Sequence, residues 1–198
     1  AMGCAPPSGK AEQHAGRPFV EIERCGGCGR CIQVCPQAAV TLVEGRARFN
    51  PERCVGCGDC MRSCGEGAIE FDWTTEIRPF VERLCEYALG AVRGKPGRVG
   101  YINFLLAITP DCDCVPWSDA AIVPDIGILA STDPVAIDHA SFDLVNSERG
   151  IARTALGEHT APGEDKFRGI WDYTDGGYQI DYAARIGLGD ASYRLIEI

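Results

Sequence analysis

The feature that most constrains this chain is a run of four closely spaced cysteines that occurs twice. Both runs follow the spacing Cys-x2-Cys-x2-Cys-x3-Cys, which is typical of thiolates that hold a cubane iron–sulfur cluster. In two-cluster proteins, the fourth cysteine of such a run ligates the other cluster. The sequence therefore predicts two [4Fe-4S] clusters with crossed ligands, one held by Cys25, Cys28, Cys31 and Cys64 and the other by Cys54, Cys57, Cys60 and Cys35.

Zinc and disulfides are the rival interpretations of so many thiols. Zinc sites usually pair two Cys-x2-Cys knuckles or add histidines, whereas here four thiols recur twice. Glycine lets the backbone approach an inorganic core closely, and glycines flank the second cysteine of each run at Gly27, Gly29, Gly56 and Gly58. With Pro36 after the fourth cysteine, the segment from Phe19 to Trp73 resembles the bacterial-type two-cluster ferredoxins.

Two positions depart from this pattern. Gly65 follows Cys64 where a proline is expected, which leaves that turn less rigid. Gly26 stands where Val55 stands in the second run, so one cluster is less shielded from water. Because solvent exposure tunes the potential of a cluster, we expect the two clusters to be inequivalent, with harmless drift within the motif as the alternative.

Composition and charge limit the partners of the chain. Its 198 residues are 45% hydrophobic, which allows a real core, and the formal net charge is −9. Nucleic acid and anionic membrane are therefore poor partners, and a redox partner protein with a basic patch is favoured. No run approaches the roughly 20 apolar residues of a membrane span, and no signal peptide opens the chain. Twelve cysteines without a secretory signal indicate a cytoplasmic location.

The first part of the chain reads as a duplication. Cys25 and Cys54 are 29 residues apart, and a repeat of this length predicts a ferredoxin module with pseudo-twofold symmetry. Strands are expected over residues 19–22 and 68–73, and a hairpin over residues 40–43 and 46–49. We divide the chain into an N-terminal loop segment, 1–18, the ferredoxin-like module, 19–73, and a C-terminal α/β region, 74–198.

The C-terminal region alternates strand and helix signals. A helix is expected from Thr75, ended by Gly90 and Gly94, and strands over residues 98–109 and 121–129. Asp133 and Pro134 predict the start of a helix that runs to Val145. A helix over residues 178–186 and a strand over residues 192–198 complete the pattern. The expected fold class is α+β, a two-cluster ferredoxin-like module joined to a small α/β layer.

Four further residue groups are candidates for chemistry. Cys112 and Cys114 lie two apart, so in an extended segment both sulfurs share a face and can meet a metal or substrate; an incidental turn is the alternative. Cys4 can approach them. Cys85 lies on the apolar stripe of its helix and is predicted to be a core thiol. His139 and Asp143 are spaced for a ligand pair, although a surface interaction is favoured.

Together these motifs resemble the family catalogued as domain of unknown function 362. The resemblance covers nearly the whole chain, and the family's function is largely undefined. Family members usually carry a further α/β segment ahead of the Met2-Gly3-Cys4 motif. We therefore expect a missing upstream segment that completes the α/β layer. The resemblance rests on Met2 to Cys4 with Gly9, Lys10 and His14, on Cys25 to Cys64, on Glu86 to Ala88, on Asp111 to Cys114, on Asp125 to Ser131, on Asp133 to Asp138, and on Ala183 to Gly189 with Tyr193.

The sequence leaves three functional hypotheses. The clusters favour one-electron transfer, with the chain as the electron-wire part of a larger redox protein. The alternative is a redox enzyme, an oxidoreductase whose site lies near Cys112 and Cys114, with Asp125 or Asp133 lining it. A structural or sensing role for the clusters is the third. No nicotinamide fingerprint, nucleophile elbow or catalytic triad is visible, so catalytic residues are not assigned.

Overall fold

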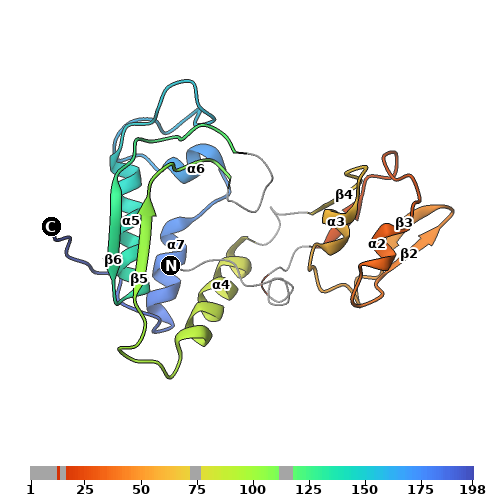
Figure 1. The fold of residues 1–198 in the computed structure, drawn as a ribbon, viewed down its shortest axis with the longest axis horizontal. Helices are drawn as coiled ribbons and strands as arrows, with labels where there is room; N and C mark the ends of the chain where they lie inside the picture. The colour runs from red at the N-terminus through yellow and green to blue at the C-terminus, as the bar shows by residue number, and fades with distance from the viewer. Residues whose placement is uncertain (1–12, 14–16, 72–76, 112–117) are drawn as a thin grey trace. The chain divides into compact units, whose positions relative to one another are not determined.

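The computed structural model of the chain describes Gln13 and residues 17–71, 77–111 and 118–198 (Figure 1). The described residues form two compact units that meet in the sequence between Leu84 and Cys85. The boundary predicted after Trp73 falls among residues 72–76, outside the described residues. Helices and short antiparallel sheets occur in both units, which confirms the predicted α+β class.

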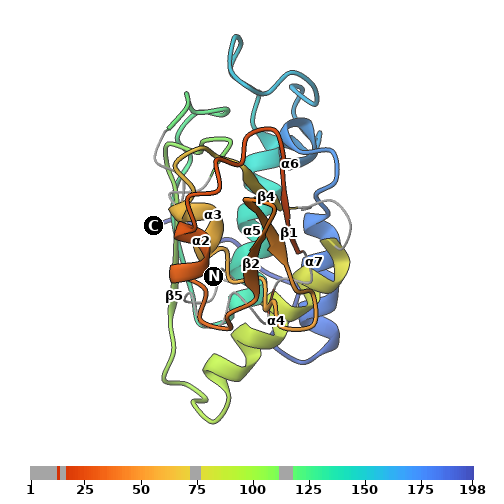
Figure 2. The same cartoon turned by 90° about the vertical axis from the view of Figure 1, so that its right-hand side faces the viewer.

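Within residues 17–71, which the structure describes, the cysteine-rich unit has four strands and two short helices. Its sheets are two antiparallel pairs, β2 with β3 and β1 with β4, and Figure 2 shows β1 beside β4. The predicted hairpin is confirmed residue for residue, and its turn at Glu44 and Gly45 has φ angles of 51° and 74°. These elements are β1 (Pro18–Val20), α2 (Arg30–Gln33), β2 (Val40–Val43), β3 (Arg46–Phe49), α3 (Asp59–Ser63) and β4 (Ile69–Phe71).

The two strand pairs of this unit repeat each other at the predicted offset. Pro18 pairs with Phe71 in the first pair, and Ala47 pairs with Leu42 in the second. Position 18 plus 29 is 47, and position 71 minus 29 is 42. The pair Pro18–Phe71 is therefore equivalent to the pair Ala47–Leu42. Each sheet therefore takes one strand from each half of the duplication, and the halves are interlocked.

Cysteine side chains form much of the core of this unit. The strands are only three or four residues long, so few large apolar side chains are available to pack between them. The buried cluster consists instead of three cysteines and four small or medium apolar residues: Cys25, Cys31, Cys60, Val40, Ala47, Ala68 and Ile69. Cysteine side chains therefore supply part of the packing of this unit.

The second unit stacks helices against a two-stranded sheet (Figure 1). The strands β5 and β6 are antiparallel, and α5 lies against both. Asn103 of β5 fixes this contact because its amide donates to Asp138 and Ser141 of α5, both at 2.9 Å. Helix α4 crosses the division between the units. The elements are α4 (Ile77–Val92), β5 (Tyr101–Leu105), β6 (Gly127–Ser131), α5 (Pro134–Ser147), α6 (Lys166–Ile170) and α7 (Gly176–Arg185).

Two predicted boundaries and one predicted strand are wrong in this unit. Helix α4 runs through Gly90 and ends before Gly94, whose φ of 76° suits a helix end. Strand β6 begins at Gly127, since the preceding Pro124 lacks the N–H that a ladder needs. Ser192–Ile198 forms no strand; Ile196 is 66% exposed, so the apolar side chains of this tail lack a covering layer. None of the described helices is long and apolar enough to cross a membrane.

Candidate metal centres

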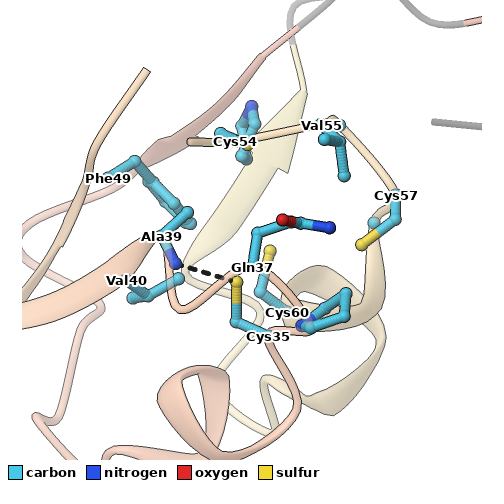
Figure 3. A pocket seen from close by; sticks show the side chains of 13 residues that line it. Cys35, Gln37, Ala39, Val40, Phe49, Cys54, Val55, Cys57 and Cys60 are labelled. Atoms are coloured by element: carbon cyan, nitrogen blue, oxygen red, sulfur yellow. Dashed lines mark hydrogen bonds between the residues drawn. The ribbon is translucent and has the colours of Figure 1, made fainter. Parts of the chain in front are cut away.

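The eight cysteines of the two runs gather around two separate hollows. The first hollow is the space lined by Cys25, Cys28, Cys31 and Cys64. The second hollow is the space lined by Cys35, Cys54, Cys57 and Cys60. In Figure 3 the sulfur atoms of Cys35, Cys57 and Cys60 face the second hollow. Each hollow thus combines three cysteines of one run with the fourth of the other.

Left-handed glycines shape the loop that wraps each hollow. Gly27 and Gly29 have φ angles of 71° and 72°, and their repeats Gly56 and Gly58 have 72° and 77°. A side chain in this conformation costs roughly 1–2 kcal/mol, so glycine is the natural residue here. Gly29 and Gly58 also precede the helices α2 and α3. The loops can therefore turn backbone N–H groups toward the sulfur atoms.

The fourth cysteine of each run receives the same hydrogen bond. The Ala39 N–H donates to Cys35 Sγ at 3.2 Å, drawn in Figure 3, and the Ala68 N–H donates to Cys64 Sγ at 3.3 Å. Ala39 and Ala68 are equivalent in the duplication. Neither alanine stands out in the sequence, because the bond uses only its backbone N–H. The only sequence signal is that both alanines occupy the same place in the repeated turn.

The thiols of the two hollows differ in their electrostatics. Hydrogen bonds from the backbone of Ala47 and Gly27 lower the pKa of Cys25. Burial raises the pKa of Cys31 in the same hollow, and in the second hollow it raises the pKa of Cys57 and takes that of Cys60 to about 12. A metal binds thiolates, so loading these sites must release protons.

Four cysteines line each hollow. Among the residues that the structure describes, no three histidine, cysteine, aspartate or glutamate side chains are placed to hold a metal ion. A tetrahedral zinc site with Zn–S bonds of about 2.3 Å brings its sulfurs to within about 3.8 Å of each other. A cubane is a larger body whose four cysteines each bind a different iron.

The other candidate residues either have structural roles or lie outside the described residues. Cys4, Cys112 and Cys114 are outside the described residues. Asp125 accepts a hydrogen bond from the Ala107 N–H at 2.6 Å. Asp133 caps α5 through the N–H groups of Val135 and Ala136, as predicted, and also accepts from Asp190. Both carboxylates are thus engaged with the backbone.

Two further predictions concern α4 and α5. Cys85 is fully buried and its thiol donates to the Gln179 carbonyl at 3.6 Å, so the predicted core thiol is confirmed. His139 Nε2 lies 3.6 Å from Asp143, and the Tyr193 hydroxyl donates to the same carboxylate at 2.7 Å. This pair therefore makes a surface interaction that fastens the C-terminal tail to α5.

Comparison with known proteins gives one family. The model of the domain of unknown function 362 matches residues 1–143, which is more than two thirds of the chain. The chain belongs to this family. The match takes in both cysteine runs as well as α4, the β5–β6 sheet and most of α5. No curated protein matches the chain.

Proposed function

We propose that the two hollows hold two [4Fe-4S] clusters, and that the chain carries single electrons through them as the electron-wire part of a larger redox protein. The observation that carries this proposal is the way the eight cysteines are divided between the two hollows. Each hollow is lined by four cysteines in the crossed grouping that two-cluster ligation requires. A bound cubane supplies one-electron chemistry between two oxidation states.

The residues around each hollow suit a negatively charged sulfur cage. Four thiols supply the ligands, and the Ala39 and Ala68 N–H groups donate to one sulfur of each set. Hydrogen bonds to an ionised acceptor are stronger than those between neutral groups. Apolar residues complete the walls, with Val40 and Phe49 at the second hollow and Leu42 and Ile69 at the first. Such walls limit the water that reaches the sulfurs.

The partner implied by this proposal is a one-electron donor or acceptor protein. The chain carries a net charge of −9, and thiolate-bound clusters add negative charge. Complementary charge accelerates encounter between redox partners, so a partner with a basic face fits best. The association rate should then fall as salt is added, because exposed charges are screened over roughly 10 Å at 0.1 M salt.

Metal content tests the proposal directly. The chain, purified without oxygen, should contain roughly eight iron and eight acid-labile sulfide, four of each for each hollow. It should also show the broad visible absorption of iron–sulfur charge transfer. A chain that carries zinc and lacks this absorption would refute the proposal.

Paired cysteine variants test the crossed ligation. Cys64→Ala should damage the site of Cys25, Cys28 and Cys31, and Cys35→Ala should damage the site of the second run. Paramagnetic resonance of each reduced variant should therefore lose a different signal. Cys85→Ser is the control, since Cys85 lies outside both hollows, and it should keep all the iron. If Cys64→Ala removes only the site of Cys54, Cys57 and Cys60, the crossed grouping is wrong.

A further inference from the structure

The interlocked halves allow the two hollows to be compared position by position. The strand registers of the halves coincide when shifted by 29 residues, and the glycine loops share their φ angles. The backbone around the two hollows is therefore nearly the same. Any difference in their chemistry must come from positions where the halves carry different residues.

The first difference is a hydrogen bond to sulfur. The Ala47 N–H donates to Cys25 Sγ at 3.5 Å in the first hollow. The equivalent residue is Pro18, which lines the second hollow with Cys54. A proline has no N–H and cannot donate to that sulfur. Donors to sulfur stabilise the extra negative charge of the reduced state, so this difference raises the potential at the first hollow.

The second difference is a reversal of charge. Arg30 lines the first hollow, and its equivalent is Asp59, whose Oδ2 lies 3.5 Å from Cys57 Sγ. With iron on that sulfur, the carboxylate faces a thiolate and opposes further negative charge. Arg62 pairs with Asp59 and offsets part of this effect. Glu66 on the first wall acts in the opposite sense to Arg30, and water screens both because both are exposed. The carboxylate of Asp59 beside Cys57 is therefore the stronger part of this difference.

The departure at Gly65 belongs to the same arrangement. A Cβ at Gly65 would stand 3.4 Å from Arg30 Nη1, which is contact with the end of a flexible side chain. The equivalent residue in the other half is Pro36. The guanidinium of Arg30 thus lies beside the position where the first hollow lacks the proline of the motif.

The third difference is exposure to water. In the loop from Gly26 to Gly29 every residue is exposed or half-buried, whereas Val55 to Gly58 are half-buried or buried. Nothing lies within 4 Å of a Cβ built at Gly26, so the first hollow lacks the cover that Val55 gives to the second. Water stabilises the more highly charged reduced state, and this again favours the first hollow.

We propose that Ala47, Arg30 and the open loop at Gly26 make the first hollow the site of higher reduction potential. The first electron from a one-electron donor protein then resides there, and the second hollow is reduced only by a stronger donor. This inference rests on the proposed function. The net effect of each of the three differences favours the first hollow, so we expect at least about a tenfold preference, equivalent to about 59 mV for one electron.

An anaerobic redox titration of the iron-loaded chain, followed by paramagnetic resonance, tests this order. Two separate potentials should appear. Asp59→Asn and Pro18→Ala should each raise the lower potential, because one removes the carboxylate beside Cys57 and the other supplies an N–H near Cys54. Arg30→Gln should lower the higher potential. Phe19→Ala is the control, since Phe19 lines neither hollow, and it should move neither.

The outcomes separate the two proposals. If Asp59→Asn shifts the higher potential, the order is wrong; if the two sites differ by less than tenfold while all the iron is present, the expected preference is wrong. In both cases the proposed function stands. If iron and sulfide are absent, the proposed function fails and the inference falls with it. Separate potentials that move as described support both.

Discussion

Three glycines of the first hollow's loop differ in a way that allows a graded test of the fold. Gly26 has ordinary backbone angles and open space around it. Gly29 has a left-handed φ of 72° but also open space, and Gly27 has a φ of 71° and lies against the backbone of the β2–β3 turn. A Cβ at Gly27 would overlap the carbonyl oxygen of Gly45. Replacing each by alanine therefore adds one effect at a time.

The expected costs follow from these contacts. Gly26→Ala should change the free energy of unfolding by less than about 0.5 kcal/mol, as for most surface substitutions. Gly29→Ala should cost roughly 1–2 kcal/mol for the left-handed backbone alone. Gly27→Ala adds overlap with a backbone atom that a rotamer change cannot relieve. Its total cost should be about 2–5 kcal/mol when an overpacking penalty is included.

Anaerobic guanidinium unfolding, followed by the visible absorption of the iron-loaded chain, measures the series. The midpoints should fall in the order Gly26→Ala, Gly29→Ala, Gly27→Ala. Iron counts should fall only for Gly27→Ala, and by up to half, since Gly27 lines only the first hollow. The reasoning is refuted if Gly27→Ala unfolds at the midpoint of Gly26→Ala and keeps its iron.

Two further predictions concern the units separately. Removing iron with a chelator should abolish amide-exchange protection in the β1–β4 and β2–β3 pairs, whose core is partly cysteine, and leave that of β5, β6 and α5 unchanged. Lys166→Met should destabilise the second unit by roughly 2–5 kcal/mol in thermal unfolding, because the buried ammonium donates to the carbonyls of Asn146, Ala161 and Glu164. The exposed Lys95, which donates to one carbonyl, is its control, and Lys95→Met should cost less than about 0.5 kcal/mol; equal losses would contradict this.

Local signals predicted the elements that local chemistry decides. The β2–β3 hairpin follows from alternating residues around Glu44 and Gly45, and the start of α5 follows from the capping carboxylate of Asp133. The grouping of the sulfurs around the hollows was also predictable, because the spacing of each run sends its fourth cysteine away from the other three. That clusters occupy the hollows stays a prediction.

Contacts between residues far apart in the sequence determine three features that local patterns do not predict. Glycine alone does not end a helix, and α4 continues through Gly90 because the residues that follow it, such as Val92, still pack in the helical core. Apolar alternation in the tail after Ser192 predicts a strand, yet the tail needs a neighbour to pair with, and hydrogen bonds of single side chains hold it instead. The contrast between Ala47 and Pro18 is visible only when the halves are aligned and their strand partners are known.

The interlocking of the halves has a consequence for the way the protein is made. The ribosome delivers Cys60, the last cysteine of the second hollow, before Cys64, the last of the first. The segment from Cys25 to Cys31 is therefore synthesised first, and more than thirty further residues must be added before Cys64, its fourth cysteine, is present. At roughly 5–20 residues per second, these thiols stay unsatisfied for a few seconds on each nascent chain. A chain that ends between Cys60 and Cys64, through truncation or ribosome stalling, would lack the fourth cysteine of the first hollow but have all four cysteines of the second.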